Sequence, residues 1–493
     1  MRSATRLGEL LAGHADVGAF ADVVVRGLSL DSRNIDAGDA FVALQGTRQH
    51  GIDFAAKALA RGASIVLAEV APAITAERLD GDVLWIEGLR KKLGLIAARF
   101  HGDPSRSMRI TGVTGTNGKT SVVQLLAQAL NRMGRSAATI GTLGAGMHGR
   151  VDAGERTTPD AINQQRLLAT FLAAAATDVA MEVSSHALDQ DRVNGIQFNV
   201  AVFTNLSRDH LDYHGDMATY AAAKQRLFAM PGLSAAVVNI DDPFGRQLMV
   251  SLPGGITRLG YAIENAHAEI RAIDVETRAS GLQFTLRTPE GEGRIESNLL
   301  GRFNVSNLLA VAASLTALGH KFDDIRVALS QLEPVRGRMS RLGGDTLQPL
   351  VVVDYAHTPD ALEQALTNLR AHCNGALVCV FGCGGERDIG KRAQMAAIAE
   401  RLADEVIVTD DNPRGEDGDA IVAAILSGFA KPDVVQIERD RGKAIQRAIT
   451  DARDNDIVLI AGKGHEPYQE VNGVRHPFDD IEVARRALGA RPC

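Results

Sequence analysis

The 493-residue chain lacks several features that mark specialised classes of protein. It has four cysteines, with no C-x-x-C pair and no spacing typical of secreted disulfides, so we expect reduced thiols in a cytosolic protein. No apolar run reaches about 18 residues, and the N-terminal stretch MRSATRLGELLAGHADVG contains acids and no small-residue cleavage site. We therefore expect neither export nor membrane insertion.

The chain also has no large excess of one charge. Its net charge of −7 argues against a nucleic acid as the main partner, although a local basic pocket for a nucleotide is compatible with it. The sequence contains no solenoid repeat and no low-complexity tract. A hydrophobic fraction of 45% and a charged fraction of 23% are those of an ordinary globular protein. The length favours about three domains of roughly 150 residues.

Two polar segments that contain glycine divide the chain into three predicted domains. They are HGDPSRS at 101–107 and EPVRGRMSRLGG at 333–344. The predicted domains cover residues 1–105, 106–336 and 337–493.

Strand and helix patterns alternate in all three parts of the chain. The first part has short strands and one clear helix, at residues 52–63. The middle part alternates strictly until residues 256–300, whose period-2 runs predict antiparallel strands at a sheet edge. The last part alternates over residues 349–464 and closes on a helix at 479–489. Such alternation predicts mostly parallel sheets covered by helices, an α/β fold.

The segment GVTGTNGKTS, residues 112–121, lies between an apolar strand and an amphipathic helix. Glycines let backbone N–H groups approach phosphate, and the helix N-terminus presents the positive end of its dipole. Lys119 can reach the terminal phosphates, and Thr120 can bind Mg²⁺. Position 113 is valine, so the strict G-x-x-x-x-G-K-[ST] pattern is not met. We predict a nucleoside triphosphate site here rather than an incidental glycine-rich turn.

Three residues in the following segments carry weaker signals. Glu182 ends the strand of DVAMEVSSH, where many phosphate-loop proteins have a metal-binding aspartate. His210 follows the next strand, in TNLSRDHLDYHG, and Lys224 lies in the helix after it. Taken singly, a lone histidine is more often structural and a lone helical lysine is more often a surface residue.

The stretch DDNPRGED, residues 410–417, follows an apolar strand. Asn-Pro and Asp favour a turn, and Gly415 can supply a positive φ. Turn chemistry does not explain Arg414. Its planar fork of donors beside carboxylates suits a ligand that carries both a carboxylate and an ammonium group.

Together these motifs resemble those of the Mur ligase family over nearly the whole chain. The resemblance also rests on the segments GRFNVSN, VDYAHTPDAL, GCGGERD and GKGHE. It is strongest to the members that add the third residue of the peptidoglycan stem peptide. The resemblance implies an α/β protein of three domains, with a central P-loop mononucleotide-binding parallel sheet for ATP. A small N-terminal α/β domain would bind the UDP end of the substrate, and a mobile C-terminal Rossmann-like domain would bind the amino acid.

The resemblance also implies roles for individual residues. The catalytic residues would be Lys119, Glu182, His210 and Lys224. ATP would be bound by Gly115, Thr116, Asn117, Gly118, Lys119, Thr120, Ser121, Asn304, Arg338 and Asp354. Two Mg²⁺ ions would be held by Thr120, Glu182, His210 and Lys224, the last as a carbamate derived from CO₂. A carbamate presents the hard oxygen ligands that Mg²⁺ prefers, whereas an ammonium group would repel the ion.

The two other substrates would be bound by residues at the two ends of the chain. The uridine end would contact Leu30, Ser32, Thr47, Arg48 and Gln49, and the muramyl dipeptide would contact Thr157, Thr158, Ser184, Gln190 and Arg192. Diaminopimelate would contact Arg387, Asp411, Asn412, Pro413, Arg414, Gly462 and Glu466.

The implied activity is an ATP-dependent, ADP-forming amide ligation through an acyl phosphate. It would join meso-2,6-diaminopimelate to UDP-N-acetylmuramoyl-L-alanyl-D-glutamate in a cytoplasmic monomer whose partners are small molecules. L-Lysine as the acceptor and a folylpolyglutamate synthetase-like ligation are the nearer alternatives. A nucleotide-binding switch without ligase activity is the most remote, because the chain has no N-K-x-D motif for reading guanine.

Overall fold

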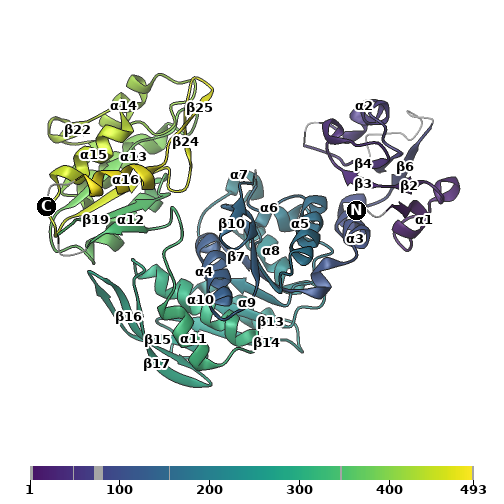
Figure 1. The fold of residues 1–493 in the computed structure, drawn as a ribbon, viewed down its shortest axis with the longest axis horizontal. Helices are drawn as coiled ribbons and strands as arrows, with labels where there is room; N and C mark the ends of the chain where they lie inside the picture. Colours follow the sequence, from purple (N-terminus) through teal and green to yellow (C-terminus); the bar gives the residue numbers. More distant parts are fainter. Residues whose placement is uncertain (1–3, 48, 72–80, 155, 345–346, 491–493) are drawn as a thin grey trace. The chain divides into compact units, whose positions relative to one another are not determined.

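The computed structural model of this chain, drawn in Figure 1, describes residues 4–47, 49–71, 81–154, 156–344 and 347–490. The chain forms two compact units: one is Met1–Tyr261 with Ala313–His320, and the other is Ala262–Ala312 with Lys321–Cys493. Within the described ranges, no helix has the length and apolar character needed to cross a membrane.

The first unit begins with a small parallel sheet in the order β3-β4-β5-β6. Val42 and Leu67 face a core shared with α1 and α3, while their neighbours Phe41 and Val66 face a second core shared with α2. Apolar residues on both faces are typical of a parallel strand covered by helices on each side. The elements of this part are β1 (Thr5–Arg6), α1 (Leu7–Leu10), β2 (Val24–Val25), β3 (Gly27–Ser29), β4 (Asp39–Ala43), α2 (Ala55–Ala60), β5 (Ile65–Glu69), β6 (Val83–Ile86) and α3 (Leu89–Phe100).

The helices of this part differ from the sequence-based prediction. The predicted helix at 52–63 is a 3-10 turn at Gly51–Phe54 followed by the short α2. The longer helix α3 was not predicted, although Leu93, Ile96 and Phe100 are spaced to lie on one face of a helix and are buried.

The second part of this unit contributes strands in the order β10-β9-β8-β11-β7-β12-β13-β14 to a larger sheet, and Figure 1 labels β7, β10, β13 and β14 among them. Strands β8, β11, β7, β12, β13 and β14 are parallel, and the hairpin β9-β10 adds an antiparallel edge. The loops that follow β7, β11 and β12 therefore leave the same edge of the sheet. The strands are β7 (Arg109–Thr114), β8 (Ala137–Gly141), β9 (Gly144–Met147), β10 (Arg150–Asp152), β11 (Asp178–Glu182), β12 (Val200–Phe203), β13 (Ala235–Asn239) and β14 (Thr257–Ala262).

Helices follow most of these strands, as the sequence predicts. They are α4 (Lys119–Arg132), α5 (Ala161–Ala173), α6 (Ser185–Asp189), α7 (Leu211–His214), α8 (Met217–Gln225) and α9 (Pro243–Ser251). After β14, the strands β15 (Ile270–Arg278), β16 (Gly281–Thr288) and β17 (Gly291–Ser297) pair antiparallel, as their period-2 pattern predicts. The helices α10 (Phe303–Ala317) and α11 (Phe322–Ser330) come next.

The second unit contains a sheet in the order β18-β19-β23-β20-β21-β22, parallel except for β18, and Figure 1 labels its strands β19 and β22. Helices α12, α13 and α14 share one core with Val352, Cys379 and Leu459, and α15 and α16 share the opposite core with Val351 and Val380. The predicted α/β fold is therefore confirmed. The elements are β18 (Ser340–Gly343), β19 (Leu350–Asp354), α12 (Pro359–Arg370), β20 (Leu377–Phe381), α13 (Gly390–Leu402), β21 (Glu405–Val408), α14 (Gly418–Leu426), β22 (Gln436–Ile437), α15 (Arg441–Asp451), β23 (Ile457–Ala461), β24 (Tyr468–Val471), β25 (Val474–Pro477) and α16 (Asp480–Gly489).

Candidate active site

The predicted phosphate loop joins β7 to the N-terminus of α4. Gly115 has φ +146, and a Cβ there would overlap the Thr204 hydroxyl, so only glycine fits this position. The Lys119 ammonium donates to the carbonyls of Gly115 (2.9 Å) and Thr116 (2.8 Å), so the side chain lies along the loop. Thr120 is buried in the first turn of α4. The loop thus presents backbone N–H groups, a cation and a hydroxyl at one helix N-terminus.

Lys224 is brought to this loop by α8 and is not the surface residue that a helical lysine usually is. It is 1% exposed, and its ammonium donates to the Gly115 carbonyl at 2.8 Å. The ring of Tyr220 lies beneath the ammonium, 4.2 Å from nitrogen to ring centroid. Burial, assisted by the charge of Lys119, lowers the pKa of Lys224 to about 6. A buried amine with a depressed pKa is one that can lose its proton near neutral pH.

Glu182 ends β11, which pairs with β7 on one side and β8 on the other. It is 1% exposed, and its carboxylate accepts the backbone N–H of Thr142 (2.7 Å) and the Thr142 hydroxyl (3.3 Å). A Cβ at Gly141 would overlap this carboxylate. Thr142 was not predicted as a site residue. No local sequence pattern marks it, because its contact with Glu182 depends on β8 and β11 being neighbours in the sheet.

His210 lies in an exposed turn before α7, with φ 53. Its Nε2 lies 3.5 Å from the Asp209 carboxylate, and its ring meets that of His186 edge to face, with centroids 4.8 Å apart. Among the residues that the structure describes, no group of three His, Cys, Asp or Glu side chains is arranged to hold a metal ion. The predicted ligand set contains only two residues of these types, Glu182 and His210, beside Thr120 and Lys224, so it stays a prediction.

The five residues predicted for the muramyl dipeptide lie in one hydrogen-bonded region beside Glu182. The Thr158 hydroxyl donates to the Glu182 carbonyl (2.9 Å) and accepts from the Ser184 N–H (3.1 Å). Arg192 donates to the Thr158 carbonyl (3.1 Å) and to the Gln190 amide oxygen (3.0 Å). The structure thus brings four of the five directly together.

Two further contacts extend this region. The Thr157 and Thr142 hydroxyls lie 3.1 Å apart, which connects the fifth residue to the Glu182 carboxylate. Tyr213, which was not predicted, accepts a hydrogen bond from the Gln190 amide (3.0 Å) and donates to Asp189 (2.7 Å). Helix α7, which begins directly after His210, thereby contacts the predicted dipeptide region.

The described residues among those predicted for the uridine end lie at the carboxyl ends of β3 and β4. Leu30 is half-buried, and Ser32 is buried at the start of a 3-10 turn capped by the Asp31 carboxylate. Thr47 and Gln49 are exposed in the loop after β4. Arg48 lies outside the described residues.

The other residues predicted for ATP lie in the second unit. The Asp354 carboxylate accepts the N–H of Met339 (2.7 Å), and the Arg338 guanidinium lies over the Tyr355 ring, 5.0 Å from its centroid. Asn304 is buried near the start of α10, where its amide donates to the Leu300 carbonyl (2.7 Å). The structure places Arg338 and Asp354 beside each other, while the Asn304 side chain bonds within its own turn.

The loop Asp411, Asn412, Pro413 and Arg414 follows β21, and its geometry corrects one expectation. The residue with a left-handed backbone is Arg414, at φ 55, and not Gly415. The Arg414 N–H donates to the Glu470 carbonyl (2.9 Å), and its guanidinium donates to the Gly385 carbonyl (2.8 Å). The strand hairpin β24-β25 thus holds the backbone of this loop on both sides of Arg414, which explains why this residue, and not Gly415, adopts the positive φ.

The segment GCGGERD packs against this loop through its glycines. The Gly385 N–H donates to the Asn412 carbonyl (2.9 Å), and a Cβ at Gly385 would overlap the Pro413 carbonyl. A Cβ at Gly384 would lie 2.8 Å from a guanidinium nitrogen of Arg414. The predicted ligand Arg387 lies in the same segment and is exposed. The two motifs therefore form one structural unit.

The loop after β23 completes this group. A Cβ at Gly462 would lie 2.5 Å from the Asp411 carboxylate, so glycine leaves room for that acid. The Glu466 carboxylate accepts the Asn412 amide (2.9 Å). Lys463, which was not predicted, is 1% exposed and donates to the Asn412 amide oxygen (2.9 Å) and to Glu466 (3.3 Å).

An exposed ion pair with Glu416 would be an alternative to a ligand-binding role for Arg414, and the structure does not contain this pair. Glu416 instead pairs with both ends of the Arg392 guanidinium, at 2.7 and 2.8 Å. This pair holds the pKa of Glu416 at about 2. Arg414 therefore keeps most of its donors for other partners.

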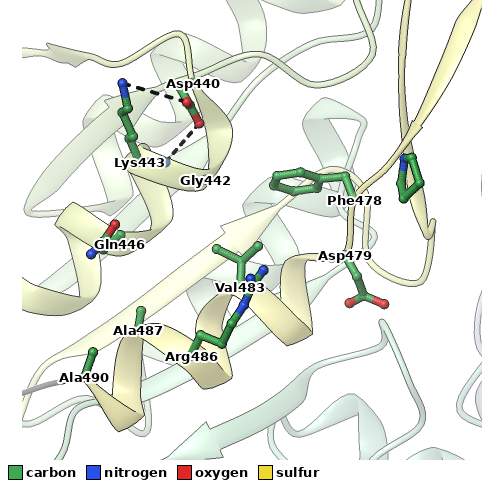
Figure 2. A pocket seen from close by; sticks show the side chains of 11 residues that line it. Asp440, Gly442, Lys443, Gln446, Phe478, Asp479, Val483, Arg486, Ala487 and Ala490 are labelled. Atoms are coloured by element: carbon green, nitrogen blue, oxygen red, sulfur yellow. Dashed lines mark hydrogen bonds and ion pairs between the residues drawn. The ribbon is translucent and has the colours of Figure 1, made fainter.

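A cavity of about 450 Å³ lies elsewhere in the second unit, between α15 and α16 (Figure 2). Its walls include Lys443, Phe478, Val483 and Arg486. None of the predicted site residues lines it.

Comparisons with known proteins agree over the whole chain. Three family models match: "Mur ligase family, catalytic domain" over residues 24–101, "Mur ligase middle domain" over 113–315 and "Mur ligase, glutamate ligase domain" over 337–464. The chain is 58% identical to the UDP-N-acetylmuramoyl-L-alanyl-D-glutamate--2,6-diaminopimelate ligase of Xanthomonas campestris, over 99% of this chain and 98% of that protein. It is 53% identical to the protein of the same name from Pseudomonas aeruginosa, over 96% of each.

Solved structures of ligases also resemble this chain. A structure of a UDP-N-acetylmuramoyl-L-alanyl-D-glutamate--2,6-diaminopimelate ligase has a TM-score of 0.76 and 37% identity, covering 99% of both chains. A folylpolyglutamate synthase of Mycobacterium tuberculosis complexed with ADP has a TM-score of 0.61, covering 74% of this chain and 90% of that one. Its identity of 21% shows a shared fold alone.

Proposed function

The chain belongs to the Mur ligase family, and we propose that it is an ATP-dependent ligase that joins meso-2,6-diaminopimelate to UDP-N-acetylmuramoyl-L-alanyl-D-glutamate in peptidoglycan synthesis. The observation that carries this proposal is the likeness, over almost the full length, to relatives named for this reaction. The loops described above supply the chemical groups that the reaction needs.

The reaction needs activation of a carboxylate, because an amine cannot displace oxide from it. ATP converts the carboxylate into an acyl phosphate, from which phosphate leaves easily. In this proposal, the N–H groups of the loop after β7 bind the phosphates, and Lys119 neutralises negative charge that develops on the transferred phosphoryl group. Its ammonium already lies along the loop, on the carbonyls of Gly115 and Thr116.

The residues near the loop fit Mg²⁺, which would polarise the phosphoryl oxygens. Mg²⁺ prefers oxygen ligands and is usually held by one or two carboxylates together with substrate phosphates. The buried Glu182 carboxylate and the Thr120 hydroxyl are such oxygens. We assign Thr120, Glu182, His210 and Lys224 to this site as a proposal.

The position of Lys224 favours its use as a carbamate. An ammonium buried beside Lys119 and the phosphate loop would oppose a second cation there, and none of the described residues places a carboxylate within hydrogen-bond distance of it. Addition of CO₂ to the neutral amine replaces that positive charge with oxygen ligands. Lys224 would then hold Mg²⁺ through oxygen.

The loops after β20, β21 and β23 select the amino acid. The far end of diaminopimelate carries an ammonium group and a carboxylate, whereas lysine carries the ammonium group alone. Arg414 can form a two-pronged pair with the carboxylate, and Asp411 and Glu466 can accept hydrogen bonds from the ammonium group. Arg387 and Gly462 belong to the same proposed site.

Mass analysis of the product tests the proposal. Purified enzyme is incubated with the UDP-linked dipeptide, ATP and Mg²⁺, and with meso-diaminopimelate, L-lysine or L-glutamate in separate reactions. We expect a new UDP-linked tripeptide with diaminopimelate, together with phosphate release that depends on this amino acid. Product with lysine alone would reassign the acceptor, and phosphate release independent of any amino acid would contradict the ligase assignment.

The setting of the reaction follows from its substrates. ATP and a UDP-linked precursor are cytoplasmic metabolites, so we propose that the enzyme acts in the cytoplasm on small molecules. We also propose that it acts as a monomer, which light scattering at several protein concentrations would test.

A further inference from the structure

Lys463 is the most completely buried charged side chain in the loop after β23. It is 1% exposed, and its ammonium donates to the Asn412 amide oxygen and to the Glu466 carboxylate. The ring of Tyr468 lies 5.5 Å from the nitrogen. The Asn412 amide donates to the same oxygen of Glu466, at 2.9 Å. Lys463 therefore connects the loop after β21 to the loop after β23.

The charges around Lys463 leave a small excess of negative charge. Arg441 and Asp480 form a fully buried pair with two hydrogen bonds, of 2.8 and 2.7 Å, so their charges cancel. Asp411 and Glu466 both face Lys463 electrostatically, with one cation between the two acids. The groups around Lys463 therefore leave about one negative charge for the ammonium end of a ligand, apart from the cations of Arg387 and Arg414 in the same proposed site.

One negative charge suits a ligand end of a particular kind. Some acceptors carry an ammonium group beside a carboxylate at their far end. Such an end places one positive charge near the acids of the site, although its own net charge is zero. The far end of lysine has a positive charge and no carboxylate. A site with two acids and no cation between them would therefore bind lysine more favourably, relative to diaminopimelate. The cation of Lys463 weakens this preference for lysine, because it neutralises one of the two acids.

We propose that Lys463 is a positioning residue that sets acceptor specificity, because it orders Asn412 and Glu466 and reduces the negative charge of the site. The proposal rests on the ligase function given above and deepens it. Lys463 does not touch the reacting atoms. It acts through the two residues that it binds and through its charge.

The test compares Lys463→Met, which is neutral and of similar length, with Lys463→Gln, which is neutral and keeps a hydrogen-bond donor. For Lys463→Met, we expect the KM for meso-diaminopimelate to rise about 10-fold, since the hydrogen bonds of a charged group to Asn412 and Glu466 are lost. The KM for ATP should change less than about 2-fold. The ratio of kcat/KM for diaminopimelate to that for L-lysine should fall about 10-fold, because the site becomes more negative.

Lys463→Gln separates ordering from charge. It should recover part of the KM for diaminopimelate, because its amide can bind Asn412, and it should leave the acceptor ratio lowered. If Lys463→Met does not fold, Lys463→Gln provides the test instead, since its amide can form hydrogen bonds with Asn412 and Glu466. The matched control is Lys443→Met: this exposed lysine pairs with Asp440 three residues away, at 4.0 Å, as Lys463 pairs with Glu466.

Three results decide the proposal. Diaminopimelate-dependent turnover of the unmodified enzyme first establishes the ligase function, and its absence would overturn that function independently of Lys463. An unchanged acceptor ratio in both Lys463 variants would overturn the role in specificity. Equal rises in the KM values for ATP and diaminopimelate would show a general structural role, and would overturn it as well.

Discussion

Arg414 carries its side chain on a left-handed backbone, with φ 55. Residues other than glycine reach this region at a cost of about 1–2 kcal/mol, and such positions cluster at functional sites. Glycine would relieve the strain without loss of any backbone hydrogen bond. The chain nevertheless has an arginine here, and this supports a role for the guanidinium group itself.

Two substitutions at this position separate side chain from backbone. Arg414→Ala and Arg414→Gly should each raise the KM for diaminopimelate about 100-fold, because both remove the charged donors, and neither should change the KM for ATP much. Arg414→Gly should be more stable than Arg414→Ala by about 1 kcal/mol, since glycine adopts positive φ freely. Steady-state kinetics and urea unfolding measure the two effects. A KM for diaminopimelate that is unchanged in both variants would disprove the assignment of this loop.

Lys224 offers a second prediction at the same scale. Lys224→Ala should lose nearly all turnover, because the proposed carbamate cannot form. Short carboxylic acids such as acetate should restore part of the activity by providing oxygens in the vacated position. The rate of phosphate release measures both effects, with Lys57→Ala, an exposed lysine of α2, as the control. Full activity of Lys224→Ala would exclude the carbamate.

At the scale of elements, the loops after β20, β21 and β23 pack closely because glycines of one loop lie against the backbone of another. The closest approach is between Gly385, in the loop after β20, and the Pro413 carbonyl, in the loop after β21. These strands are neighbours in the sheet, so both loops leave the same edge. The spacing of the loops depends on the missing side chain at Gly385.

Gly385→Ala should push these loops apart. We expect a fall in stability of about 1–3 kcal/mol from steric overlap and a rise in the KM for diaminopimelate larger than that for ATP. Unfolding by urea and steady-state kinetics provide the measurements. Gly489→Ala, at the end of α16 where a Cβ would meet no atom within 4 Å, is the control and should behave like the unmodified enzyme. A variant Gly385→Ala with normal kinetics would show that the two loops act independently.

The sequence predicted elements with a clear period and missed those without one. The strand β7 and helix α4 were found because apolar spacing and the glycine loop between them agree. The hairpin β24-β25 was missed because none of its residues is buried, so its pattern is not apolar. Its contact with Arg414 could not be predicted either.

The same reasoning applies to the site. The glycine loops and Arg414 were predicted from motifs that are continuous in sequence. Lys463 and Thr142 were missed because their partners come from other loops: Lys463 meets Asn412, 51 positions earlier, and Thr142 meets Glu182, 40 positions later. Such contacts depend on which strands become neighbours in the sheet, and local spacing does not give that order.

At the scale of the whole molecule, acid should destabilise the protein in two pH windows. Burial lowers the pKa of His465 to about 4, below its ordinary value of 6.5. The unfolded chain therefore binds this proton first, and stability falls as the pH decreases from about 6.5 to 4. Glu416, held at a pKa of about 2 by Arg392, contributes stability above its ordinary pKa, and this is lost as the pH falls from about 4.5 to 2.

Urea unfolding at a series of pH values measures these windows. His465→Gln should make the loss of stability in the upper window smaller and leave the lower window unchanged, and Glu416→Gln should do the reverse. Other buried histidines with a lowered pKa, such as His357 and His372, should keep part of the upper window. Stability that is independent of pH between 7 and 4 would contradict the burial of a neutral His465.

The first unit is built from two stretches of chain that are far apart in sequence, because it includes Ala313–His320 as well as Met1–Tyr261. Arg109 in β7 donates to the Leu318 carbonyl, 209 positions later, at 3.2 Å. During synthesis on the ribosome, the unit therefore cannot be completed until the segment 262–312 has been translated and Ala313–His320 follows it. At about 5–20 residues per second, this delay is about 3–10 seconds. For that time the nascent chain carries β7 and its phosphate loop without the segment that completes their unit, and it is then open to aggregation and to chaperones.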